Sequence, residues 1–171
     1  GVWLVVSMGG VQRGKGRSGK WWAQEGAGIT TDAIETARGL GGGFPGGAIR
    51  GTDEAAKGMV PGVHGTTFGG NQLARAAANA VMDIMEEDGF MDRVCEISTT
   101  LRKGLGELVD AKPSVFEAVR GAGLMLGLKV KEGVVNVDVI NKAREFGLVT
   151  VGASENVIRL LPPLTIEETH V

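Results

Sequence analysis

A single basic side chain, Arg38, stands before the most glycine-rich stretch of the sequence, residues 39–47 (GLGGGFPGG). Glycine has no Cβ atom, so its backbone can approach a ligand or another chain closely, and Pro45 stiffens the exit of the turn. A guanidinium at the entrance of such a turn could bind an anion or an anionic cofactor through its planar fork. The same composition is typical of an exposed loop with one solvated arginine, so the residues alone leave both interpretations open.

A second basic segment, residues 13–20 (RGKGRSGK), follows an apolar run and two glycines. It approximates the phosphate loop G-x-x-x-x-G-K-[ST], with Gly9, Gly14 and Lys15 matching the glycines and the lysine. Gly16 occupies the position of the hydroxyl residue that binds Mg²⁺ in such loops. NTP hydrolysis is therefore a minor alternative.

The composition of the chain excludes several classes of function. Its 171 residues suit one domain or one and a half, and its net charge of −2 provides no field that would favour nucleic acid or an acidic membrane. The apolar opening VWLVV is far shorter than the roughly 20 residues of a membrane span. His64 and His170 are too scattered for a metal site, and the single cysteine, Cys95, is typical of a reducing compartment. We therefore expect a cytoplasmic protein that binds no nucleic acid, membrane or metal.

Apolar patterning and turn signals divide the chain into strands and helices. Short apolar runs predict strands at Val2–Met8, Ala33–Thr36, Ala48–Gly51, Phe116–Arg120, Leu124–Val130, Val149–Val151 and Val157–Leu161. Apolar spacings of three and four predict helices at Asn71–Glu87, Asp92–Leu108 and Val137–Phe146, and Thr52 is a plausible cap for a helical turn at Asp53–Gly58. The apolar face of the Asn71–Glu87 helix includes Leu73 and Ile84. From Val115 onward the pattern indicates a small α+β unit.

Three separated motifs occur in the order ARGLGGGFP, HGTTFGGN and NVIRLLPPLTI. With them the chain resembles the class III (ornithine-type) aminotransferases, nearest to those that act on acetylornithine, from about Val2 to Val171. The resemblance implies an α/β fold: part of the fold type I architecture of enzymes that use pyridoxal phosphate (PLP). It assigns residues 1–109 to part of the large PLP-binding domain with its linking helices, and 110–171 to the small C-terminal domain. It covers only the second half of such an enzyme. Because the chain starts inside a predicted central strand and finishes at the opening of a predicted helix, IEETHV, we expect both ends to be cut.

The resemblance also implies site residues, and two of them depart from the family pattern. The family's Schiff-base lysine stands where this chain has Arg38, and the aspartate that pairs with the pyridine nitrogen stands where it has Gly9. A guanidinium stays protonated near neutral pH and cannot form the imine. Any PLP is therefore expected to be bound non-covalently at best.

Three further residues keep the types that the family uses. The resemblance implies that Gln12 contacts the ring hydroxyl, that Thr67 reaches the PLP phosphate of the neighbouring subunit in a homodimer, and that Arg159 clamps the substrate carboxylate. Without the resemblance, Thr67 also fits a turn or helix cap, and Arg159 fits a solvated strand arginine.

The function implied by the resemblance is transfer of an amino group between an N-acetylornithine-like donor and 2-oxoglutarate through PLP. Because the lysine and the aspartate are both replaced, we expect this chain alone to be inactive. The alternative is a non-catalytic homologue, fragment or engineered scaffold that keeps the packing and binds anions.

Overall fold

The computed structural model describes residues 6–171, which form two compact units. The first unit contains residues 6–16 and Lys20–Phe90, and the second contains Arg17–Gly19 and Met91–Val171. Most of the predicted Val2–Met8 strand lies outside the described residues. Compactness alone does not assign a family domain, so the boundary between residues 109 and 110 stays a prediction.

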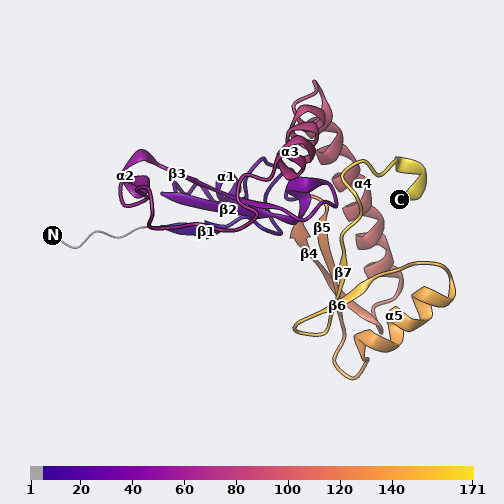
Figure 1. The fold of residues 1–171 in the computed structure, drawn as a ribbon. Helices are drawn as coiled ribbons and strands as arrows, with labels where there is room; N and C mark the ends of the chain where they lie inside the picture. The colour runs from indigo at the N-terminus through magenta and orange to yellow at the C-terminus, as the bar shows by residue number, and fades with distance from the viewer. Residues whose placement is uncertain (1–5) are drawn as a thin grey trace. The chain divides into compact units, whose positions relative to one another are not determined.

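A three-stranded sheet forms the centre of the first unit, with strand order β1-β2-β3 (Figure 1). β1 (Ser7–Gly9) runs parallel to β2 (Ala33–Ala37), and β3 (Gly47–Gly51) pairs antiparallel to β2. A parallel pair needs a crossover connection, and here the connection carries a short helix, α1 (Ala23–Ala27), that the sequence did not predict. In β2 the buried Ile34 and Thr36 alternate with the exposed Glu35, the period of two expected of a strand. The predictions of β2 and β3 are confirmed.

Two helices of the first unit begin at side-chain caps. The Thr52 hydroxyl accepts the backbone N–H of Ala55 at 3.2 Å and starts α2 (Asp53–Ala56), as predicted. The Asn71 carbonyl oxygen accepts the N–H of Ala74 at 3.0 Å and starts α3 (Gln72–Met85). α3 packs on the 3₁₀ turn η1 (Arg38–Gly41).

The apolar face predicted for α3 is only partly buried. Leu73 and Ile84 are 64% and 47% exposed, whereas Met85 is buried. The reason is the width of the partner surface: η1 is a single short turn, and it covers one side of a fourteen-residue helix.

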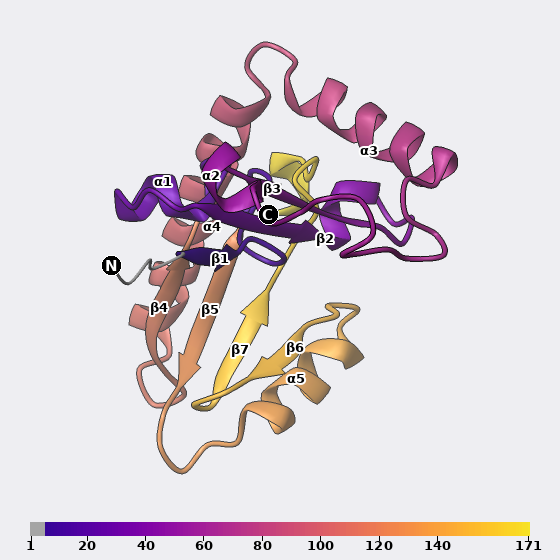
Figure 2. The ribbon, with the colours of Figure 1, turned by 60° about the vertical axis from the view of Figure 1, so that its left-hand side comes forward.

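The second unit is built on a four-stranded antiparallel sheet with strand order β4-β5-β7-β6 (Figure 2). Its elements follow the order α4 (Phe90–Ala111), β4 (Phe116–Ala122), β5 (Met125–Val130), α5 (Asn136–Glu145), β6 (Val151–Ala153), β7 (Val157–Leu160) and the 3₁₀ turn η2 (Glu168–His170). Leu126, Leu128 and Val130 of β5 face a core that also holds Leu105 of α4 and Ile140 of α5. One face of the sheet is therefore buried under its own helices.

The predicted strand Val149–Val151 was placed too early, because β6 begins at Val151. Val151 pairs with Arg159, so Val149 would have to pair with Leu161. Leu161 lies beyond the end of β7 and is followed by Pro162, which has no N–H to donate. Val149 is accordingly 78% exposed.

A short piece of the N-terminal sequence belongs to the second unit. The Leu124 N–H donates to the Arg17 carbonyl oxygen at 2.9 Å, and the Arg17 guanidinium donates back to the Leu124 carbonyl oxygen at 3.2 Å. Gly123, at φ 57°, lies so close to the Ser18 backbone that a Cβ atom there would clash. Residues 17–19 are thus fixed against the β4–β5 turn.

None of the helices in residues 6–171 is both long and apolar enough to cross a membrane. Over the same residues, no group of three His, Cys, Asp or Glu side chains is placed to hold a metal ion.

Candidate functional site

Three of the five candidate residues lie at or after the carboxyl ends of the parallel strands β1 and β2. Gly9 is the last residue of β1 and pairs with Glu35, and the next N–H, that of Gly10, donates to the Glu35 carbonyl oxygen at 2.7 Å. Gln12 lies exposed in the turn after β1, and Arg38 directly follows β2. Parallel strands place their carboxyl ends at one edge, where open α/β sheets bind ligands. The fold therefore gathers Gly9, Gln12 and Arg38 at the same edge of the sheet.

Arg38 has an unusual backbone conformation. Its φ angle is 47°, in the left-handed region, which costs a non-glycine residue about 1 kcal/mol. Strain of this kind concentrates at functional sites. Arg38, Phe44 and Pro45 line a hollow of about 550 Å³, with glycines making up most of the remaining wall. In the part of the chain that the structure describes, no carboxylate pairs with Arg38.

The donor set at this edge suits an anion and does not fit covalently bound PLP. The Arg38 guanidinium donates hydrogen bonds but has no free lone pair with which to attack an aldehyde. At Gly9 a built Cβ atom meets nothing within 4 Å, so the position has room for a side chain but offers no carboxylate for a ring nitrogen. The amine and the acid that PLP chemistry needs are both missing from these two positions.

Thr67 lies in the exposed segment that precedes α3. Its neighbours Thr66 and Phe68 line a hollow of about 700 Å³ together with Leu40 and Phe44, from the segment after β2. The first unit thus brings the HGTTFGGN motif and the GLGGGFP segment together. Thr67 itself is exposed beside this hollow rather than part of its wall.

Arg159, the fifth candidate, lies in β7 of the second unit and is considered there alone. It pairs with Gly127 of β5 on one side and Val151 of β6 on the other. Ile158 points into the core, so Arg159 points to the opposite face of the sheet. Its Nε atom is buried and has no hydrogen-bond partner in the described structure. The Nε donor is therefore shielded from solvent, and no residue among those that the structure describes supplies it with an acceptor.

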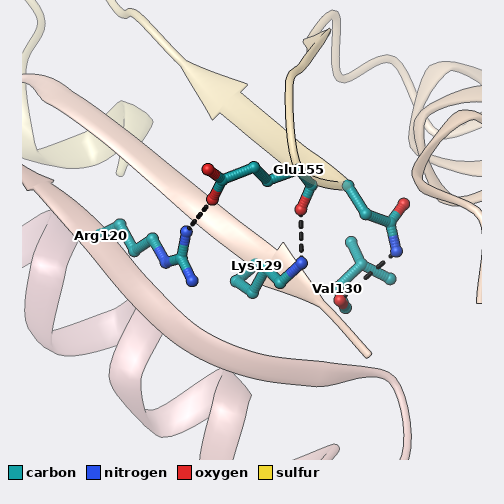
Figure 3. Close-up of polar contacts among 5 residues, drawn as sticks. Arg120, Lys129, Val130 and Glu155 are labelled. Carbon is teal, nitrogen blue, oxygen red and sulfur yellow. Dashed lines mark hydrogen bonds and ion pairs between the residues drawn. The ribbon is translucent and has the colours of Figure 1, made fainter. Parts of the chain in front are cut away.

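Two further cations share this outer face (Figure 3). Arg120 lies in the same cross-strand row as Gly127 and forms an ion pair with Glu155, with Nη1 2.7 Å from Oε2. The Lys129 ammonium donates to the Glu155 carbonyl oxygen. Glu155 and the chain around it therefore engage Arg120 and Lys129, while the Nε of Arg159 stays without an acceptor.

Sequence reasoning missed both the Glu155 cluster and the burial of Lys15. Arg120 and Glu155 are 35 residues apart and meet only through strand order, which no local pattern reveals. Lys15 stands between two glycines in a basic segment, a setting that favours solvent, yet it is 6% exposed. The pair Trp21–Trp22 that follows was the one available signal of burial nearby.

The family model for class-III aminotransferases matches residues 4–171, and the chain therefore belongs to that family. Among curated relatives, the acetylornithine aminotransferase of Mesorhizobium japonicum is 50% identical over 98% of this chain and 42% of its own length. The solved N-acetylornithine aminotransferase of Stenotrophomonas maltophilia aligns with a TM-score of 0.84 and 29% identity, over 96% of this chain and 43% of that one. A Toxoplasma gondii ornithine aminotransferase, with partial occupancy of PLP at its active site, aligns with a TM-score of 0.90 and 26% identity, over 97% and 40%.

The alignments confirm the predicted fold class, a partial PLP-dependent transferase fold of the α/β type. The chain spans less than half the length of each of these relatives. The roles of Gly9, Gln12, Arg38, Thr67 and Arg159 stay predictions, because similarity over part of an enzyme does not test individual side chains.

Proposed function

We propose that this chain descends from an enzyme that moves an amino group between an N-acetylornithine-like donor and a 2-oxo acid such as 2-oxoglutarate. Its own contribution is to bind the carboxylate of such a substrate through Arg159. The observation that carries the proposal is the buried Nε of Arg159, which lacks a partner in the described structure. Leaving a buried charged donor unpaired is costly, and a carboxylate matches the guanidinium fork.

The proposal assigns no covalent step of amino-group transfer to Arg38. Arg38 instead holds an anionic group, such as the phosphate of non-covalently bound PLP, at the edge where Gln12 is also exposed. The Thr67 hydroxyl of one subunit supplies a further contact to the anion that the neighbouring subunit binds. The glycines beside Thr67 leave the backbone N–H groups accessible.

The chain is further proposed to form a homodimer in the cytoplasm. The first unit exposes Ile49 and Phe68 to 74% and 79%, and apolar side chains of this size favour a protein interface. Cys95 is free and is the only cysteine of the sequence, which suits a reducing compartment. Sedimentation equilibrium tests the assembly, and a monomer at all concentrations would contradict it.

Calorimetric titration with 2-oxoglutarate tests the carboxylate site. Arg159→Lys keeps the charge but loses the fork, so it should weaken binding by about tenfold. Arg144→Lys, on the exposed side of α5, is the matched control and should bind as the wild type does. Equal affinity in Arg159→Lys and the wild type would refute the assignment. No binding by the wild type at millimolar 2-oxoglutarate would favour the non-catalytic scaffold instead.

A gain-of-function variant tests whether Gly9 and Arg38 stand at the positions of the family's aspartate and lysine. Arg38→Lys combined with Gly9→Asp restores an amine and a carboxylate at the sheet edge, and after addition of PLP it should show the absorbance band of an imine. Reduction with borohydride and peptide mass mapping should then place the adduct at residue 38. An adduct elsewhere would show that the assignment of these two positions is wrong. No adduct would mean either that the assignment is wrong or that PLP binding needs the part of the relatives that this chain does not span.

A further inference from the structure

The larger of the two hollows described above, with a volume of about 700 Å³, lies between α3 and the segment that follows β2. Its apolar wall comes from three places in the chain. Leu40 and Phe44 follow β2, Phe68 precedes α3, and Ala74 and Ala78 belong to α3 itself. Ligand cavities in proteins commonly measure about 300–1,000 Å³ and have mostly apolar walls. The hollow therefore has the size and the lining of a small-molecule site.

Two neighbouring rows of side chains on α3 determine the shape and the polarity of this hollow. Ala74 and Ala78 are four residues apart, so they share one face of the helix, and their short side chains leave the space beside them open. Asn71, Arg75 and Asn79 repeat the spacing of four in the adjacent row, and all three line the hollow. An open apolar strip thus lies beside a polar one.

The polar row supplies groups that have no partner within the chain. Among residues 6–171, Arg75 forms no ion pair, and the side chains of Arg75 and Asn79 form no hydrogen bond. The Asn71 carbonyl oxygen accepts the Ala74 N–H at 3.0 Å, which leaves the Asn71 amide NH₂ group as a donor. No aspartate or glutamate is among the described residues that line the hollow. The wall therefore has one positive charge and no acid to neutralise it.

We propose that this hollow binds small aromatic monocarboxylates. The ligand carboxylate accepts two parallel hydrogen bonds from the planar fork of Arg75. The ring system of the ligand packs against Phe44 and the two alanines, where an aromatic body removes most apolar surface from water. Arg75 is the one charged side chain among the described residues of the wall, so a second negative charge on the ligand would face no cation.

This site is separate from the one in the proposed function. None of the five candidate residues of that function lines the hollow, and its substrate carboxylate is assigned to Arg159 in the other unit. A dicarboxylate such as 2-oxoglutarate has two charges and no aromatic body. The two sites should therefore bind different ligands independently of each other.

Calorimetric titration of the intact chain with 2-naphthoate and with 2-naphthamide tests the proposal, because the two probes share their rings and differ in charge. The wild type should bind 2-naphthoate at least about tenfold more tightly than 2-naphthamide. Equal affinities, or no binding of 2-naphthoate at millimolar concentration, would overturn the proposal. An excess of 2-oxoglutarate should leave the binding of 2-naphthoate unchanged. Displacement by 2-oxoglutarate would assign the probe to the other site and would also overturn the proposal.

A change at Arg75 tests the charged contact. Arg75→Gln stays polar at an exposed position of α3, so the helix should be unaffected. The variant should bind 2-naphthoate about tenfold more weakly and 2-naphthamide as the wild type does. Arg50→Gln, at an exposed position of β3 outside the hollow, is the matched control and should bind both probes normally. Equal losses in the two variants would mean that only the net charge of the chain matters, which would refute the role of Arg75.

A change at Ala78 tests the apolar strip. Ala78→Leu places a larger side chain in the open space, and leucine is nearly as good a helix former as alanine. This variant should bind both probes at least about tenfold more weakly. Ala76→Leu, at an exposed position of α3 outside the hollow, is its control and should bind both probes as the wild type does. With helix content verified by circular dichroism, unchanged binding in Ala78→Leu would place the ligand elsewhere and overturn the proposal.

Discussion

The two units differ in how completely they bury their apolar side chains. In the second unit, α4, α5 and the four-stranded sheet enclose a core that includes Leu126, Leu128 and Val130. In the first unit, Ile34 and Met85 are the large apolar residues that are buried among those described, and they keep 5% and 4% of their surface exposed. β3 is exposed along its whole length. Both units have apolar patterning in sequence, but only the second buries its apolar side chains under its own helices.

This difference shows that apolar patterning alone does not make a closed core. The sheet of the first unit has three strands, and one short turn covers part of α3. The relatives are more than twice as long as this chain, so the architecture that they share has elements beyond the ones described here. The second unit should consequently carry most of the stability, and the two units should unfold separately.

The largest expected effect is a cavity in the second unit. Leu126→Ala should lower its free energy of unfolding by about 3 kcal/mol, because Leu126 is 1% exposed. Ile49→Ala removes a similar side chain from the first unit, where it is 74% exposed, and should change stability by less than about 0.5 kcal/mol. Hydrogen exchange of peptides from β5 and β3 during a urea series measures each unit. Equal losses of unfolding free energy for the two substitutions would contradict the difference between the two units.

The hairpin between β6 and β7 gives the next effect. The Asn156 side chain donates to the Val134 carbonyl oxygen at 2.7 Å and accepts the Asn136 N–H at 2.9 Å, from a backbone with φ 58°. Asn156→Ala should therefore cost about 2 kcal/mol by urea denaturation, and Asn156→Gly somewhat less because glycine tolerates this φ. Asn141→Ala, on exposed α5, is the control. A larger loss in the glycine variant would show that backbone strain is unimportant here.

Lys15 is a charged side chain whose burial weakens the first unit. Burial lowers its pKa from the ordinary value of 10.5, so between the two values the unfolded chain binds more protons and stability rises with pH. Lys15→Met should raise the free energy of unfolding at pH 7 by about 1 kcal/mol, with a gain that shrinks as the pH approaches 10.5. Thermal unfolding across this pH range measures the effect. Lys57→Met, at an exposed site, should show no such trend, and a parallel trend in both would remove burial as the cause.

The smallest effect belongs to the ion pair on the outer face of the second unit. The side chains of Arg120 and Glu155 are 48% and 70% exposed, so Glu155→Gln should cost less than about 0.5 kcal/mol and less still at high salt. A salt series of urea denaturations checks this. A loss above about 1 kcal/mol would mean that the Glu155 cluster stabilises the unit more than an exposed ion pair does.

Several elements were predictable because their signals are local. Thr52 and the short apolar runs of β2 and β3 carry such signals, and the structure confirms them. α1 was missed because its N-cap, Trp22, has no side-chain oxygen; the Trp22 N–H is instead bound by Glu25 at 2.9 Å. The start of β6 depended on where its partner strand ended, which Pro162 decides from a distant position.

The features of the candidate site also differ in whether the sequence could predict them. The placement of Gln12 and Arg38 at one sheet edge follows from two parallel strands and could be expected from their positions in sequence. The buried Nε of Arg159 depends on strand pairing with Gly127. The burial of Lys15 depends on an indole seven residues away, folded back over the loop. Both arise from tertiary packing, which apolar periodicity does not encode.

The placement of residues 17–19 against Leu124 has a consequence for inheritance. The second unit is not one uninterrupted stretch of chain, because three of its residues are encoded more than seventy positions upstream of the rest. A gene that began at Met91 would lose the carbonyl that accepts the Leu124 N–H, together with the backbone that fits against Gly123. Recombination at that point would therefore yield a damaged module, and the two units are expected to evolve as a linked pair.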